Sequence, residues 1–131
     1  MAQFFDRQDA NNPRNGLIVR DEQEIQQILD ASTGRPRFFA EIIGDNGFKL
    51  LIGIGGEVGC VQYSPTDGRT PYLMALSKEN SADIGYEEFL IGGEASQVPR
   101  RFCMPRDAVA QIAKYFVRTG NRNPDVAWEE I

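Results

Sequence analysis

The sequence predicts an α+β fold, in which a largely antiparallel β-sheet is packed against two amphipathic helices. Two segments carry apolar side chains at helical spacing, and the residues between them show strand-like alternation broken by glycine turns. The resulting order of helix, several strands, helix and closing strand is typical of this fold class. A length of 131 residues is enough for one core, so we expect a single domain over residues 17–131.

Residues 1–16 are expected to form a flexible N-terminal arm, because the Asn-Pro and Asn-Gly steps in this segment are typical of loops. The segment contains no apolar stretch of the signal-peptide kind. No apolar run in the chain approaches the roughly 18 residues needed to span a membrane. We therefore expect a cytoplasmic protein. Its first ordered element is predicted to be a short strand at residues 17–19.

The first helix is predicted over residues 21–32, where Asp21 is placed to cap it and Glu24 follows as in a capping box. The second helix is predicted to open at Pro105 and to end at Gly120. The apolar stripes are Ile25, Ile28 and Leu29 in the first helix, and Val109, Ile112, Ala113 and Phe116 in the second.

The segment between the helices reads as antiparallel strands joined by tight turns, at Asp45-Asn46-Gly47, Gly55-Gly56-Glu57 and Pro65-Thr66-Asp67-Gly68. Four side chains of one strand alternate onto a single face, namely Phe48, Leu50, Ile52 and Ile54. We expect strands at 37–43, 48–54, 58–63, 72–76, 88–92, 98–103 and 126–131. Pro99 suits an edge strand, and Trp128 is expected to pack in the core.

The composition excludes several kinds of active site. Histidine is absent, which removes Ser-His-Asp and Cys-His catalysis and the commonest metal ligand. Cys60 and Cys103 are expected to be two buried free thiols, and two cysteines are too few for a usual structural zinc site. We therefore expect no catalytic residues, no metal and no cofactor.

Two motifs invite a chemical interpretation that their context does not support. The glycine-rich run at 53–59 resembles a dinucleotide-binding loop, but strand-like alternation resumes at Val58 where such a loop requires a helix. The doublets Glu87-Glu88 and Glu129-Glu130 do not form carboxylate pairs, because adjacent residues of a strand point to opposite faces. We interpret the glycines as a hairpin turn.

Charge is distributed unevenly along the chain, whose net charge is −5. Residues 77–97 contain five acids against one lysine, and residues 98–122 contain six basic residues against one aspartate. The two segments are either solvated faces that neutralise each other or an acidic patch aimed at a basic partner. Negative charge disfavours direct binding of nucleic acid, and no membrane partner is expected.

An ordered series of short motifs resembles the Imm-one family of immunity proteins from bacterial polymorphic toxin systems. These motifs are the glycine-rich run at 52–59, Glu87-Glu88-Phe89-Leu90, Gly92-Gly93-Glu94, Val98-Pro99, Thr119-Gly120 and Trp128-Glu129-Glu130. The resemblance covers residues 17–131 and implies an α+β antidote encoded beside secreted toxins, many of which are nucleic-acid deaminases. Members of the family usually carry a stretch such as YYFDG where this chain has residues 88–92, which leaves the cognate toxin open.

We therefore expect an immunity protein, not an enzyme, that binds a cognate toxin 1:1 and blocks its active site or substrate groove. The hypothetical toxin-binding residues combine acids with nearby aromatics and are Asp67, Tyr72, Glu79, Asp83, Tyr86, Glu87 and Glu88. The basic helix face with Arg106, Lys114 and Arg118 is a competing surface. The alternatives are a small ligand-binding or enzymatic domain that uses a cup in the sheet, and a structural module that dimerises through an edge strand.

Overall fold

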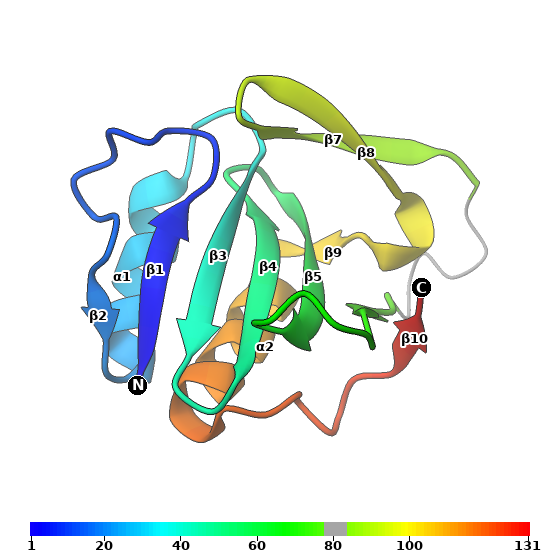
Figure 1. The fold of residues 1–131 in the computed structure, drawn as a ribbon. Helices are drawn as coiled ribbons and strands as arrows, with labels where there is room; N and C mark the ends of the chain where they lie inside the picture. Colours follow the sequence, from blue (N-terminus) through cyan, green and yellow to red (C-terminus); the bar gives the residue numbers. More distant parts are fainter. Residues whose placement is uncertain (78–83) are drawn as a thin grey trace.

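The computed structural model describes residues 1–77 and 84–131 and confirms the predicted α+β fold. Its two α-helices are α1, Glu22–Ser32, and α2, Arg106–Thr119. Both helices lie against the same face of the sheet and pack against each other (Figure 1). We call this helix-covered side the rear face of the sheet and the opposite side the front face.

The main sheet has the strand order β10-β6-β5-β4-β3-β1-β2, and all of these neighbours are antiparallel. Its strands are β1 Ala2–Asp6, β2 Ile18–Val19, β3 Phe38–Gly44, β4 Phe48–Ile54, β5 Val58–Pro65, β6 Leu73–Ala75 and β10 Trp128–Glu130. A two-residue strand, β9 Met104–Pro105, pairs separately with β5 and leads into α2. The strands of the main sheet are thus paired with their neighbours in sequence, except in the β10–β6 and β3–β1 pairs.

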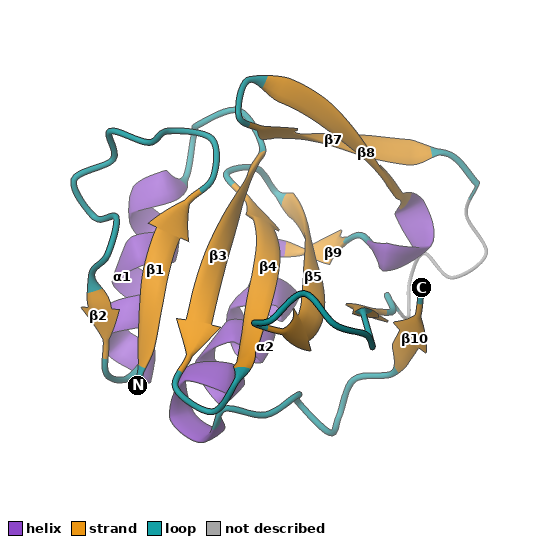
Figure 2. Cartoon of the chain, viewed as in Figure 1, coloured by secondary structure: helices purple, strands orange, loops and turns teal. Residues whose placement is uncertain are grey.

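A hairpin of two six-residue strands, β7 Tyr86–Ile91 and β8 Glu94–Pro99, crosses the end of the main sheet (Figure 2). It joins the sheet through a parallel bridge between Phe38 and Leu90. At its tip, the Gly92 amide donates to the Arg7 carbonyl at 2.9 Å and the Gly93 amide donates to the Gln8 side chain at 2.8 Å. The hairpin is therefore held at its tip by the segment that follows β1.

The expectation of a flexible arm over residues 1–16 is wrong for residues 2–6, which form β1. This strand pairs with β3 over its full length, and Phe4 is buried in the core. The segment after it is also fixed by hydrogen bonds, because Asp6 accepts the amides of Gln8 and Asp9 at 2.8 Å. The Asn-Gly step that suggested an arm is a turn between β1 and β2.

The strand predicted at 98–103 is also wrong in its bounds. β8 runs over Glu94–Pro99, and residues 100–102 form a short 3₁₀-helix, η1 Arg100–Phe102. The reason is a tight turn at Gly92 and Gly93, whose φ angles of 56° and 85° are easily adopted by glycine. This turn sends the chain back along β7 several residues earlier than the sequence interpretation allowed.

The predicted cap of α1 and the predicted end of α2 are confirmed, whereas α2 begins at Arg106, one residue after the predicted Pro105. The Asp21 side chain accepts the Glu24 amide at 2.9 Å, which satisfies one free amide in the first turn of α1, and the Glu24 side chain accepts the amide of Arg20, the residue before the cap, at 2.9 Å. Gly120 ends α2 in the left-handed conformation, with φ of 77°. The predicted apolar stripe of α2 is buried against the sheet.

Two apolar clusters flank the sheet. The larger one lies on the rear face, between sheet and helices, and contains Phe4, Leu50 and Phe116. The smaller one lies on the front face beneath the hairpin and contains Phe39, Cys60, Met74, Phe89, Val98, Phe102 and Cys103. Both cysteines are buried free thiols, as predicted, and Trp128 packs partly buried against the rear cluster.

Candidate functional site

The front face of the main sheet carries one continuous row of side chains that lie directly opposite one another on neighbouring strands. From β1 to β10, this row consists of Phe5, Glu41, Leu51, Gln62, Met74 and Glu129. The row faces forward because the neighbouring residues of β4, Leu50 and Ile52, point into the rear core. Its composition is mixed, with apolar and amide side chains at the centre and charged side chains toward the edges.

A groove of about 250 Å³ lies between the centre of this row and the hairpin. We call it the front groove, and it is lined by Phe39, Leu51, Cys60, Gln62, Met74, Ile91, Ser96, Gln97, Val98, Pro99, Phe102 and Ile131. Two of these apolar side chains are in contact with solvent, since Ile91 is 37% and Ile131 is 58% exposed. The groove is mainly apolar, with amide and hydroxyl groups from three residues, which is a composition suited to binding an apolar side chain.

A cluster of charges lies beside the groove at Glu41. This carboxylate accepts hydrogen bonds from Arg7 and from Lys49, whose Nζ lies 2.7 Å from Glu41 Oε2. Burial alone would raise the pKa of Glu41, but the hydrogen bonds and positive charges of Lys49 and Arg7 outweigh it and hold the pKa below its ordinary value. Glu41 therefore stays ionised, and its negative charge is paired with Arg7 and Lys49 of the same chain.

A second cluster is centred on Glu87, one of the predicted toxin-binding residues. Its two oxygens lie 3.0 Å from Arg37 and 3.5 Å from Arg100, and its side chain is only 23% exposed. Burial and the nearby Glu87 charge raise the pKa of the Cys103 thiol to about 11, so this thiol stays protonated. Glu87 thus joins the hairpin to η1 and to Arg37, the residue before β3, and the structure does not present it as a free surface charge.

The other predicted site residues fall into two groups. Tyr86 and Glu88 are exposed on β7, whereas Asp67 and Tyr72 belong to the 66–72 loop between β5 and β6. In that loop Asp67 lies 3.5 Å from Arg69, and the Tyr72 hydroxyl donates to the Gly68 carbonyl at 2.7 Å. Glu79 and Asp83 lie outside the described residues.

The acidic and basic segments of the sequence are partly neutralised by each other and by distant residues. Arg101 lies 2.7 Å from Glu129, and Arg118 lies 3.7 Å from Glu22. Among the described residues, the Glu87–Arg100 contact joins the two segments, whereas Arg101 and Arg118 pair with acids that lie outside both of them. The acids of the hairpin that remain exposed are Glu88 and Glu94.

The family model described as immunity protein Imm1 matches residues 2–130 of the chain. This chain belongs to the Imm1 family. The match confirms the resemblance seen in the sequence and begins at β1, so the residues first expected in an arm lie within the family region. A search of curated proteins found no match.

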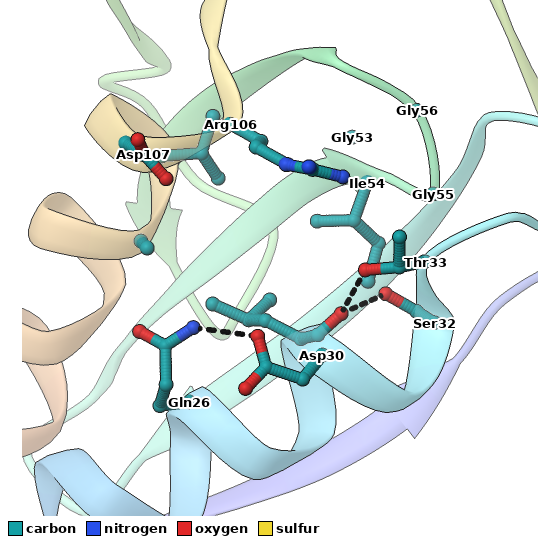
Figure 3. Close-up of a pocket in the computed structure, with 13 residues that line it drawn as sticks. Gln26, Asp30, Ser32, Thr33, Gly53, Ile54, Gly55, Gly56, Arg106 and Asp107 are labelled. Atoms are coloured by element: carbon teal, nitrogen blue, oxygen red, sulfur yellow. Dashed lines mark hydrogen bonds between the residues drawn. The ribbon is translucent and has the colours of Figure 1, made fainter.

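A second cavity of the Imm1 protein, of about 230 Å³, lies between the end of α1, the β4–β5 turn and the start of α2 (Figure 3). It contains Gly53 to Gly56, the run that resembled a dinucleotide-binding loop. The run is a hairpin turn that leads into β5, as predicted, and no helix follows it. Polar groups around the cavity bond to each other, since Gln26 donates to Asp30 at 2.8 Å and Ser32 donates to the Leu29 carbonyl at 2.7 Å.

The described residues of the Imm1 protein also provide no usual metal site. No group of three or more acids or cysteines gathers at a possible metal position within residues 1–77 and 84–131. Neither described helix has the length and apolar composition that a membrane crossing requires. The candidate site that the geometry offers is a binding surface formed by the front groove and the exposed residues of the hairpin.

Sequence reasoning missed the groove and the residues that line it. Leu51, Gln62 and Ile131 were not singled out, because their shared position depends on pairing between strands that are distant in sequence. One local signal was available in the adjacent Gly92 and Gly93, which are typical of a two-residue hairpin turn. This signal would have placed β8 at residues 94–99 and left one of its edges open.

Proposed function

We propose that this Imm1 protein binds a cognate bacterial toxin, a nucleic-acid deaminase, and neutralises it by blocking its active site or substrate groove. The observation that carries this proposal is the family match, which spans nearly the whole chain and not a single motif. The toxin's identity as a deaminase is supported by the resemblance of the sequence to antidotes of such toxins. The protein would act in the cytoplasm of the producing cell.

The mechanism that we propose is binding without chemistry. The sequence contains no histidine, and the two cysteines are protonated and buried. A deaminase that acts on nucleic acid needs a basic groove for the phosphate backbone, and a protein with a net charge of −5 is complementary to such a groove. Complementary charge would speed the encounter, and desolvated contacts would set the lifetime of a 1:1 complex.

The surface that we propose for the toxin centres on the hairpin. Tyr86 is 59% exposed and Glu88 is also exposed, so both can contact a partner without disturbing the fold. Asp67 and Tyr72 in the 66–72 loop belong to the same proposed surface, and the Tyr72 carbonyl accepts the amide of Ile131, a residue of the front groove. Glu79 and Asp83 stay in the proposal as predicted contacts. Glu87 would act indirectly, by fixing the hairpin through Arg37 and Arg100.

The proposal is tested with the purified product of the toxin gene that neighbours this one. We expect a 1:1 complex by light scattering, loss of deaminase activity on single-stranded DNA or RNA at equimolar protein, and weaker binding as salt is raised. A complex that forms without loss of activity would contradict neutralisation. No binding to any neighbouring gene product would contradict the proposal as a whole.

The surface is tested by reversing one exposed charge of the hairpin. We expect Glu88→Lys to lower toxin affinity about tenfold or more, because it places a cation against a basic partner. Glu57→Lys is the matched control, since Glu57 is an exposed acid in the β4–β5 turn beside the other cavity. Equal effects of the two substitutions would show that only net charge matters and would remove the hairpin as the contact surface.

A further inference from the structure

The outer edge of β8 is open to a partner. β8 pairs with β7 on one side, and no strand in the described part of the chain pairs with its other side. This edge is 6 residues long, whereas the edges of the main sheet are β2, with 2 residues, and β10, with 3. Short edge strands are one way in which proteins avoid unwanted pairing. The main sheet has this protection, and β8 has only Pro99 at its end.

Two residues direct their backbone groups toward the open edge. The Arg100 amide donates to the directly opposite Gly85 carbonyl at 3.0 Å, so Gly85 and Arg100 occupy a hydrogen-bonded position of the hairpin ladder. Hydrogen-bonded positions recur at every second residue of an antiparallel ladder. Ser96, four residues before Arg100, therefore directs its backbone N–H and C=O groups to β7. Ala95 and Gln97 therefore direct their N–H and C=O groups away from β7, and both residues are exposed.

The front groove opens along the same edge. Four consecutive residues of β8, at positions 96–99, line the groove. Alternate side chains of a strand point to opposite faces. Consecutive residues of β8 can therefore line the same groove only if the groove lies along the edge of the strand. A second strand laid along β8 would hold its backbone against Ala95 and Gln97 and direct one side chain into the space above Leu51 and Met74.

The acidic charge of the hairpin indicates which kind of partner strand would pair with β8. Between residues 86 and 99 there are three acids and no lysine or arginine. Glu87 is paired within the chain, whereas Glu88 and Glu94 are exposed and form no ion pair with any described residue. A second copy of this chain would bring acids close to acids, which is unfavourable across a sheet. A strand that carries lysine or arginine beside an apolar residue is complementary.

We propose that the toxin extends the hairpin by one strand. An extended toxin segment pairs with Ala95 and Gln97, inserts an apolar side chain into the front groove, and places basic side chains near Glu88 and Glu94. This inference rests on the proposed function, because the toxin is the partner that the proposed function names. It adds the mode of recognition, which is backbone pairing at a strand edge in addition to contact between side chains.

The test compares two substitutions at one residue. Gln97→Pro removes the N–H that faces the open edge and leaves the ladder with β7 intact, so we expect toxin affinity to fall about tenfold or more. Gln97→Ala removes the side chain and keeps the N–H, and we expect its affinity to stay within about threefold of the wild type. Both affinities are measured by isothermal calorimetry, after thermal melts have shown that each variant folds.

Amide hydrogen exchange on the unmodified protein gives a second readout that does not depend on any variant. On toxin binding, exchange at Ala95 and Gln97 should slow by about tenfold or more, with a smaller change at Ser96, whose amide already bonds to β7. This every-second-residue pattern is specific to strand pairing. A general covering of the surface would protect all three amides alike.

The outcomes separate this inference from the proposed function. Equal toxin affinity of Gln97→Pro and Gln97→Ala, with wild-type binding intact, would overturn strand pairing and leave the immunity function standing. Failure of the wild-type protein to bind the toxin would overturn both. A dimer of the isolated protein that Gln97→Pro dissociates would show that a second copy, and not the toxin, occupies the edge.

Discussion

The two faces of the sheet are covered in different ways. On the rear face, two helices of 11 and 14 residues cover the strands and bury an extended cluster that includes Phe4, Leu50 and Phe116. On the front face, a hairpin crosses one end of the sheet and buries a smaller cluster around Phe89. Between that hairpin and the centre of the sheet lies a groove of about 250 Å³.

This difference separates stability from recognition. The rear face can contribute most of the apolar burial that stabilises a domain of this size, and its side chains are already in contact with the helices. The front face has incomplete cover, an open strand edge and exposed acids on one element. A partner can therefore gain contacts there without removing any that hold the fold together.

The largest effect should come from the rear core. Phe116→Ala removes a ring that is 1% exposed and lies edge-on to Tyr63, with ring centroids 6.2 Å apart. We expect it to lower the free energy of unfolding by about 3–5 kcal/mol, measured by urea denaturation. A loss below about 1 kcal/mol would show that the rear face does not dominate stability.

A smaller effect is expected where the front cluster meets the sheet. A methyl group at Gly53 would lie 2.6 Å from the Phe89 ring and 2.8 Å from Cys60 Sγ, closer than unstrained contact permits. Gly53→Ala should therefore lower the free energy of unfolding by about 1–3 kcal/mol. In a Phe89→Leu background the same substitution should cost less, because the ring is gone. Equal costs in both backgrounds would mean that the hairpin does not pack on Gly53.

A pH-dependent effect is expected from Glu41 on the front face. Its pKa in the folded protein is lowered from an ordinary value of 4.5, so its contribution to stability is full above that value and is lost as pH falls through the lower, folded pKa. Glu41→Gln should therefore reduce stability by about 1 kcal/mol near neutral pH and less in acid. Urea denaturation from pH 6 to pH 3 checks this, and parallel pH profiles of wild type and variant would contradict it.

The smallest effect on stability should come from the rim of the groove. Ile91 is 37% exposed, so Ile91→Ser should change the free energy of unfolding by no more than about 0.5 kcal/mol. The same substitution should weaken toxin binding measurably, because Ile91 lines the front groove. A large loss of stability with unchanged binding would reverse the roles assigned to the two faces.

The elements that were predicted correctly are those determined by nearby residues. The Asp21 cap and the Gly120 helix end depend on side-chain and backbone preferences within a few positions. The role of Glu87 could not be predicted in this way, because its ion-pair partner Arg37 is 50 residues away. Charge counts along the chain grouped Glu87 with exposed acids. Its ion pairs with Arg37 and Arg100 become visible only in the folded structure.

The placement of β1 is an intermediate case. Its apolar residues Phe4 and Phe5 were visible in the sequence, but the pairing that makes the segment a strand is with β3, more than 30 residues later. The groove was harder still to predict, because it depends on contacts among six strands, η1 and the chain end. Local patterns therefore predicted the fold class, whereas the site required the three-dimensional pairing.

The position of Ile131 has a practical consequence for any fusion protein. Its amide donates to the Tyr72 carbonyl at 2.9 Å, and its side chain lines the front groove. The amino group of Met1 lies instead 3.6 Å from Asp45, next to β1 and β2 and away from β10 (Figure 1). An affinity tag joined after Ile131 would begin at the front groove and would obstruct toxin binding there, so weak binding of such a fusion would not report on the protein itself. A tag joined before Met1 leaves the groove free.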